Sequence, residues 1–174
     1  VNNILDTRIQ VKSKLTKNFW SGFFQNSLLF LDIYYFSQWL KTTKSNSVKN
    51  FIEVQENLRL TILQTIASAA WANDIIEEEE KTLFNFFLQS ANLNPENQKI
   101  AKAMLDDVNR QDHLPKLTEE PWIIKKYILE LAILTVWADR KVEETEKEYI
   151  KNLSTKLNIS DTELDGSLLA IESF

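Results

Sequence analysis

The groups best suited to chemistry are two runs of carboxylates, at 71–81 and 137–147, which start on matching Trp-Ala steps. The runs are 66 positions apart (137 − 71 = 66). Carboxylate oxygens are the ligands that Ca²⁺ and Mg²⁺ prefer in proteins. The acidic side chains that could serve are Asp74, Glu77 and Glu80 in the first run and Asp139, Glu143 and Glu146 in the second. Their types and spacing are compatible with a divalent-cation site on one or both runs.

The same glutamates also have a purely structural explanation. A glutamate at the start of a helix, with a second one three residues later, is typical of a capping box. Glu77 and Glu143 are the expected N-caps, and Glu80 and Glu146 are the residues that reach back. Acid in a first turn also suits the helix dipole, which is worth about 0.3–1 kcal/mol per charge. The sequence is compatible with both roles of these glutamates, as cation ligands and as helix caps.

An EF-hand does not fit either run. A loop that starts at Asp139 has Lys141 at its third position and Ile150 at its twelfth, where a bidentate Glu is required. A loop that starts at Asn73 places Phe84 at the twelfth position. Any cation site here would therefore have a different geometry.

The rest of the chain has few groups for catalysis. His113 is the only histidine, there is no cysteine, and the only glycines are Gly22 and Gly166. Without a second His or a Cys, neither a transition-metal site nor a nucleophilic triad can be assembled. Two isolated glycines cannot form a phosphate-binding loop. We expect a protein that is not an enzyme.

The composition predicts that helices position these groups. Two Gly and three Pro among 174 residues leave little material for tight turns. Apolar spacing and polar breaks predict helices at 23–41, 48–71, 77–91, 95–109, 121–137, 143–157 and 161–172. The order of helix, acidic turn, helix, cap and helix occurs twice, with Asn94 and Ser160 as the expected N-caps of the third helix in each copy. We expect an all-α, single-domain bundle of about seven or eight helices with an internal two-fold sequence repeat.

The charge divides the chain into two parts. Residues 1–50 hold seven basic and two acidic residues, and the remainder holds 13 basic (20 − 7) and 23 acidic (25 − 2). We expect a basic, aromatic-rich N-terminal helical segment at 1–47. A duplicated domain would follow at 48–174, with repeats at about 48–109 and 121–174 packed as one unit. The acidic body excludes nucleic acid as a partner on charge.

The N-terminal segment has a composition of its own. Nine aromatic residues lie between 19 and 40, with Lys12, Lys14 and Lys17 before them and Lys41, Lys44 and Lys49 after them. Basic flanks around an aromatic helix are typical of contact with a membrane surface or of a helix that docks a partner. Burial against the bundle is the alternative. Interspersed polar residues argue against a transmembrane span, and Val1 at the start suggests a piece of a longer polypeptide.

The acidic runs resemble a known family. Ala138-Asp139-Arg140-Lys141-Val142-Glu143-Glu144-Thr145-Glu146 is similar to Ala-Asp-Gly-x-(Ile/Val)-x-x-x-Glu, the hallmark of tellurite-resistance TerB-like helical domains. The resemblance covers about 51–174. Arg140 replaces the glycine of the pattern, while Asn73 and Asp74 replace the Asp and Gly in the first copy. The resemblance implies a helical bundle, a divalent-cation site on the acidic turns and a role in membrane-linked stress or metal-response assemblies, with no established reaction.

Together these features predict a non-enzymatic protein-interaction or sensing module. It would be cytoplasmic and close to a membrane, with an unidentified protein partner and membrane-surface contact through residues 19–40. A weak Ca²⁺ or Mg²⁺ site would lie on the acidic turns. The alternative is a purely structural helical domain of a larger polypeptide, in which the acidic turns act only as helix caps.

Overall fold

A computed structural model describes residues 26, 28–34, 36–37, 48–106, 117–139 and 141–172. These residues form helices joined by turns, and the described ranges contain no strand. The prediction of an all-α chain is confirmed. The helices are α2 (Val48–Ala70), α3 (Glu78–Ser90), α4 (Pro95–Ala103), α5 (Trp122–Val136), α6 (Glu144–Lys156) and α7 (Asp161–Glu172).

The helix ends follow the polar breaks in the sequence. Asp74, Asn92 and Asn158 have positive φ angles of 68°, 46° and 56°. Short polar side chains tolerate this left-handed conformation, which commonly ends a helix. Asn94 caps α4 by accepting the Asn97 N–H at 2.9 Å, and Pro95 follows as its first residue. The predicted cap at Asn94 is confirmed.

One predicted boundary is wrong. The helix expected at 95–109 ends at Ala103, and 104–106 form a turn. The N–H of Met104 bonds to the carbonyl of Ala101, and that of Asp106 bonds to the carbonyl of Ala103, both at 3.1 Å. These i→i−3 bonds tighten the chain and end the α-helical ladder. The predicted hinge at 111–121 and its His113 fall mainly outside the described residues, which resume at Leu117.

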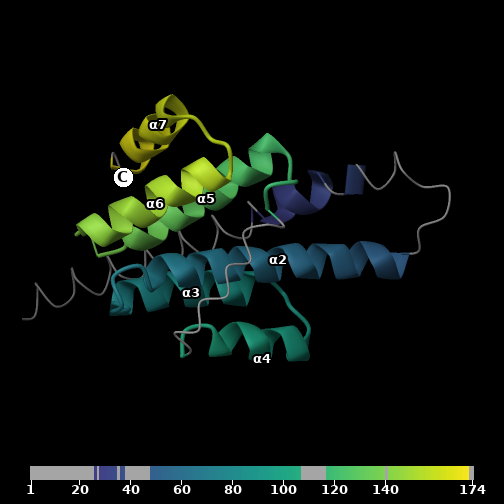
Figure 1. The fold of residues 1–174 in the computed structure, drawn as a ribbon. Helices are drawn as coiled ribbons and strands as arrows, with labels where there is room; N and C mark the ends of the chain where they lie inside the picture. Colours follow the sequence, from purple (N-terminus) through teal and green to yellow (C-terminus); the bar gives the residue numbers. More distant parts are fainter. Residues whose placement is uncertain are drawn as a thin grey trace, which may run out of the picture.

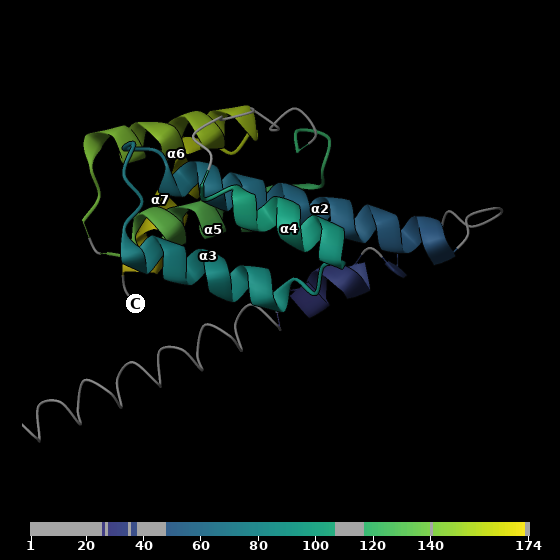
Figure 2. The ribbon, with the colours of Figure 1, turned by 90° about the horizontal axis from the view of Figure 1, so that it is seen from below.

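Helix α2 is the central element of the described structure. It packs against α3 and α4 and also against α5 and α6. Figure 1 shows α3 and α4 on one side of α2, with α5 and α6 on the other. Helix α7 rests on α5 and α6. Figure 2, turned by 90°, shows the length of α2 running between these neighbours.

The core forms between α2, α3 and α5. The largest side chains with almost no exposure include Ile62 and Leu63 of α2, Phe84 and Phe87 of α3, and Ile128 of α5. Full burial of such a side chain stabilises the fold by about 1.5–3 kcal/mol. Helix α5 is apolar on most of its circumference, which explains its place against several neighbours.

The aromatic helix, described at residues 26, 28–34 and 36–37, has two different faces. Leu28 and Leu31 are buried in the core. Arg59 of α2 holds this helix through Asp32, whose two carboxylate oxygens lie 2.6 and 2.7 Å from Nη2. Its Nη1 donates to the carbonyl of Ala91 at 2.8 Å, so Arg59 ties the aromatic helix to the C-terminal end of α3.

The opposite face of the aromatic helix is exposed. Its large apolar side chains have exposed fractions between 48% and 60%: Leu29, Phe30, Ile33 and Phe36. Burial and exposure, which were alternatives for this segment, therefore apply to different faces of one helix. Other residues of the predicted aromatic segment lie outside the described residues, including Tyr35, Trp39 and the flanking lysines at 12–17 and 41–44. No described helix is both long and apolar enough to cross a membrane.

Candidate functional site

The two acidic turns come together at one end of the structure. Helices α2 and α5 both end there, and the turns at 71–77 and 137–143 lie on the same side in Figures 1 and 2. Asn73 Nδ2 of the first turn donates to Glu146 Oε1 of α6 at 3.3 Å. We call this contact region, formed by Asn73, Glu80, Asp139 and Glu146, the junction.

Each turn leads into a capping box. Glu77 is the N-cap of α3, and its backbone N–H donates to Glu80 Oε2 at 2.9 Å. Glu143 is the N-cap of α6, and its N–H donates to Glu146 Oε2 at 2.7 Å. The predicted structural role of these four glutamates is confirmed. Because each carboxylate satisfies a free backbone N–H, the helices have a local reason to start where they do.

The residues before the caps also match. Asn73 Oδ1 accepts the N–H of Ile75 at 3.0 Å, and Asp139 Oδ1 accepts the N–H of Lys141 at 2.8 Å. These are Asx turns, in which a side-chain oxygen takes the place of a backbone acceptor. They orient the second polar atom of each side chain. In Asn73 that atom is an amide nitrogen, which reaches Glu146.

The six carboxylates predicted as cation ligands are not equivalent. Glu80 and Glu146 are only 2% and 3% exposed, whereas Asp74, Glu77 and Glu143 face solvent. Asp139 is half-buried. Among the residues that the structure describes, no three acidic or imidazole side chains are arranged as a metal-binding group. Glu80 and Glu146 are therefore buried at the junction and Asp139 is half-buried, while the other three carboxylates lie at exposed positions.

Burial dominates the protonation of the junction. It raises the pKa of Glu80 to about 8; the hydrogen bond from Glu77 opposes this shift, and the charges of Glu146 and Asp139 add to it. Burial also raises the pKa of Glu146, against the hydrogen bond from Glu143 and together with the charge of Asp139. A charged carboxylate away from water is unfavourable without compensating donors. Burial therefore favours the neutral form of the Glu80 carboxyl group.

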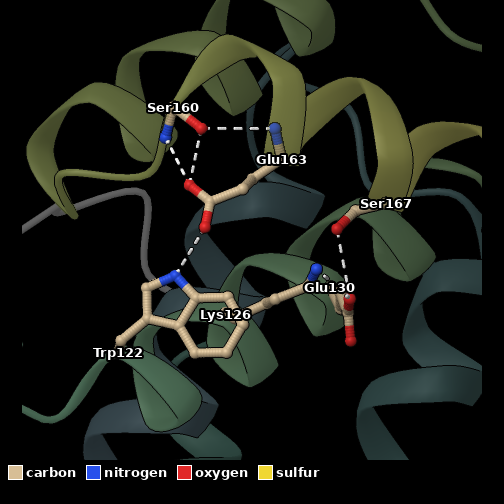
Figure 3. A network of polar contacts seen from close by, with 6 residues as sticks. All are labelled: Trp122, Lys126, Glu130, Ser160, Glu163 and Ser167. Atoms are coloured by element: carbon tan, nitrogen blue, oxygen red, sulfur yellow. Dashed lines mark hydrogen bonds and ion pairs between the residues drawn. The ribbon is translucent and has the colours of Figure 1, made fainter.

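A third helix cap, at the start of α7, has a glutamate that is surrounded by hydrogen-bond donors. Glu163 of α7 accepts the N–H of Ser160 at 2.9 Å and the Oγ–H of Ser160 at 2.6 Å. Trp122 Nε1 of α5 donates to its other oxygen at 2.9 Å, as Figure 3 shows. Led by the Ser160 hydroxyl, these donors lower the pKa of Glu163. The predicted cap at Ser160 is confirmed.

Sequence reasoning missed three of the residues that organise these contacts. Asn73 was noted only as a departure from the acidic pattern, and its polarity was the available signal. The pairing of Arg59 with Asp32 spans 27 positions (59 − 32 = 27) and has no local signature. The contact of Trp122 with Glu163 spans 41 positions and likewise has no local signature.

Comparison with family models, curated proteins and solved structures finds no match to this chain. The TerB-like resemblance stays a prediction that rests on the acidic motif.

Proposed function

We propose that the chain is a non-enzymatic interaction module that docks on an anionic membrane surface through the exposed face of its aromatic helix. The module would fold as a single bundle of two related halves. The single observation that carries this proposal is the apolar face of Leu29, Phe30, Ile33 and Phe36, which stays exposed although the opposite face of the helix is buried.

The arrangement of this helix suits an interfacial role. Residues 29, 33 and 36 follow helical spacing, and Phe30 widens the same apolar face. A helix of this kind lies in the plane of the membrane, with its apolar side chains inserted to the level of the acyl boundary. Leu28 and Leu31 meanwhile attach it to the core. The docking face would thus be presented by a folded support.

The sequence that follows this helix is basic, which favours anionic lipid. Asp32 is the only acidic residue between 26 and 37, and Arg59 pairs with both of its oxygens. Lys41, Lys44 and Lys49 follow the helix in the sequence. Basic residues close to a membrane surface gain about 1 kcal/mol each from anionic headgroups.

The alternative function, a purely structural helical domain, has support only at the acidic turns. Both turns form capping boxes, which give their glutamates a function in the fold. A module that docks through its aromatic helix needs no further role for them. The divalent cation that the TerB-like resemblance implies stays a prediction.

Cosedimentation with vesicles tests the docking proposal. Wild type and the double variant Phe30→Ser/Ile33→Ser would be compared on vesicles of phosphatidylcholine mixed with phosphatidylglycerol. Wild type should pellet with the vesicles. The variant should bind on the order of tenfold to hundredfold more weakly, because two inserted side chains are lost.

Leu169→Ser is the matched control, since Leu169 is 68% exposed on α7, away from the aromatic helix. It should bind like wild type. Circular dichroism establishes that all three proteins keep their helices. Equal binding by the double variant and wild type would contradict the proposal. Absence of wild-type binding to these vesicles would also contradict it and would favour a protein partner for the same face.

A further inference from the structure

Helix α2 carries two exposed apolar residues near its start. Ile52 is 52% exposed and Val54 is 53% exposed, so both side chains are open to solvent to the same extent. Successive residues of an α-helix are rotated by about 100° around its axis, which turns Val54 about 200° away from Ile52. The two residues therefore lie on opposite sides of α2 although they are close in sequence.

The side of α2 that carries Ile52 is the side that holds the aromatic helix. Gln55 Nε2 donates to Asp32 Oδ1 at 3.0 Å, and Arg59 Nη2 contacts both oxygens of the same carboxylate. Ile52 precedes Gln55 by three positions (55 − 52 = 3) and Arg59 by seven (59 − 52 = 7). This is the spacing of residues on one side of a helix. Val54 lacks it to both residues.

The aromatic helix and α2 run in opposite directions. Figures 1 and 2 show the aromatic helix beside the N-terminal half of α2, with its C-terminal end toward the end at which α2 begins. From the contact between Asp32 and Gln55, one turn onward in the aromatic helix reaches Phe36. One turn back in α2 reaches Ile52. Phe36 and Ile52 are thus the next pair of positions along the line where the two helices meet.

This pair continues the exposed apolar face of the aromatic helix. Phe36 is 48% exposed, close to the value for Ile52. Further along the same side of α2, Leu63 and Ile66 are almost fully buried in the core. Ile52 therefore belongs to the apolar side of α2 but lies beyond the part of that side that the core covers. An exposed apolar residue in such a position is suited to contact with another apolar phase.

The charges around Ile52 are compatible with an anionic bilayer. Glu56, on the same side of α2, accepts the backbone N–H of Asn94 at 2.8 Å and its side-chain amide at 2.5 Å. Its carboxylate is therefore engaged with donors of the protein itself. Glu53 is rotated about 100° from Ile52, toward the flank of the helix. Lys49 adds a basic residue to the first turn of α2, and basic residues are attracted to anionic headgroups.

We propose that the membrane-docking surface extends from the aromatic helix onto the first turns of α2, where Ile52 enters the bilayer interface beside Phe36. This inference rests on the proposed function and deepens it, because it assigns a second helix and an orientation to the docked protein. Two antiparallel helices would lie against an anionic bilayer. Contact through both helices fixes the rotation of the protein about the aromatic helix, and Val54 then faces away from the bilayer.

Single-cysteine labelling tests which side of α2 meets the bilayer. The chain has no cysteine, so Phe30→Cys, Ile52→Cys and Val54→Cys each accept one environment-sensitive fluorophore. The labelled proteins are mixed with vesicles of phosphatidylcholine and phosphatidylglycerol. The labels at 30 and 52 should emit at shorter wavelengths and become brighter, because they leave water. The label at 54 should keep its emission, although Val54 is as exposed as Ile52 in the free protein.

Substitution by serine tests the same surface without a label. Ile52→Ser should bind these vesicles about threefold to tenfold more weakly than wild type, because one inserted apolar side chain is lost. Val54→Ser is the matched control and should bind like wild type. Circular dichroism establishes that both variants keep their helices. Equal binding by Ile52→Ser and wild type would overturn the extension onto α2.

The outcomes of the labelling experiment separate this inference from the docking proposal. A response at 30 without one at 52, or equal responses at 52 and 54, would overturn the extension and leave docking through the aromatic helix intact. No response at 30 would contradict both. An emission shift at 52 that appears without vesicles as protein concentration rises would identify a second copy of the chain as the occupant, which would also overturn the extension.

Discussion

Three glutamates of this chain occupy the same local position, but their surroundings shift their pKa values in different directions. Glu80, Glu146 and Glu163 each accept the backbone N–H of a residue three positions earlier. Burial raises the pKa of the first two, whereas the donors around Glu163 lower its pKa. The sequence predicts the cap in each case because capping is local. The sequence cannot predict the direction of the pKa shift, because burial of the carboxyl group depends on which helix packs against it.

Loss of Arg59 should weaken the contacts that join α2, the aromatic helix and the C-terminal end of α3. Arg59→Ala removes the contacts with both oxygens of Asp32 and the bond to Ala91; Asp32 then keeps the Gln55 Nε2 donor at 3.0 Å but loses its charged partner. We expect a loss of about 2–3 kcal/mol in the free energy of unfolding, measured with urea. Lys147→Ala breaks an exposed pair with Glu144 and should cost about 0.5 kcal/mol or less. Equal losses in the two variants would refute the expectation for Arg59.

At the scale of the elements, the sequence predicted where helices start more accurately than where they end. Asn94 with Pro95 and Ser160 with Glu163 mark the first turns of α4 and α7, because caps depend on side chains close in sequence. The end of α4 at Ala103 was missed. Apolar spacing continues past it through Met104, so periodicity alone does not show that the chain tightens into a turn.

Helix α4 should depend strongly on its cap. Asn94 accepts the N–H of Asn97 and donates its side-chain amide to Glu56 of α2 at 2.5 Å. Asn94→Ala should cost about 1–2 kcal/mol and should increase amide hydrogen exchange in α4 more than elsewhere. Asn85→Ala, at an exposed interior position of α3, is the control and should cost little. Uniform exchange changes over all helices after Asn94→Ala would argue against a local cap.

At the scale of the whole molecule, the hydrophobic core crosses the boundary between the two predicted repeats. Helices α2 and α5 share the largest interface between described elements, and their buried residues belong to one cluster. Repetition of the helix pattern predicted two similar halves. It could not predict that their acidic turns meet, because Asn73 and Glu146 are 73 positions apart (146 − 73 = 73) and no local interaction links them.

The shared core predicts cooperative unfolding. Ile128→Ala in α5 should cost about 2–4 kcal/mol, because the side chain is fully buried and leaves a cavity. Differential scanning calorimetry should show one transition in wild type and variant, and hydrogen exchange should accelerate together in α3 and α6. Ile75→Ala, which is 62% exposed, should shift the transition little. Two separate transitions would contradict the single bundle proposed above.

The length of α2 separates the aromatic helix from the junction. The aromatic helix is held at Gln55 and Arg59, while the junction begins just beyond Ala70, fifteen residues after Gln55 (70 − 55 = 15). At 1.5 Å per residue this separation is about 22 Å. Mobile ions screen charges over about 8 Å at physiological ionic strength. Charges at these two ends of α2 are therefore largely screened from one another.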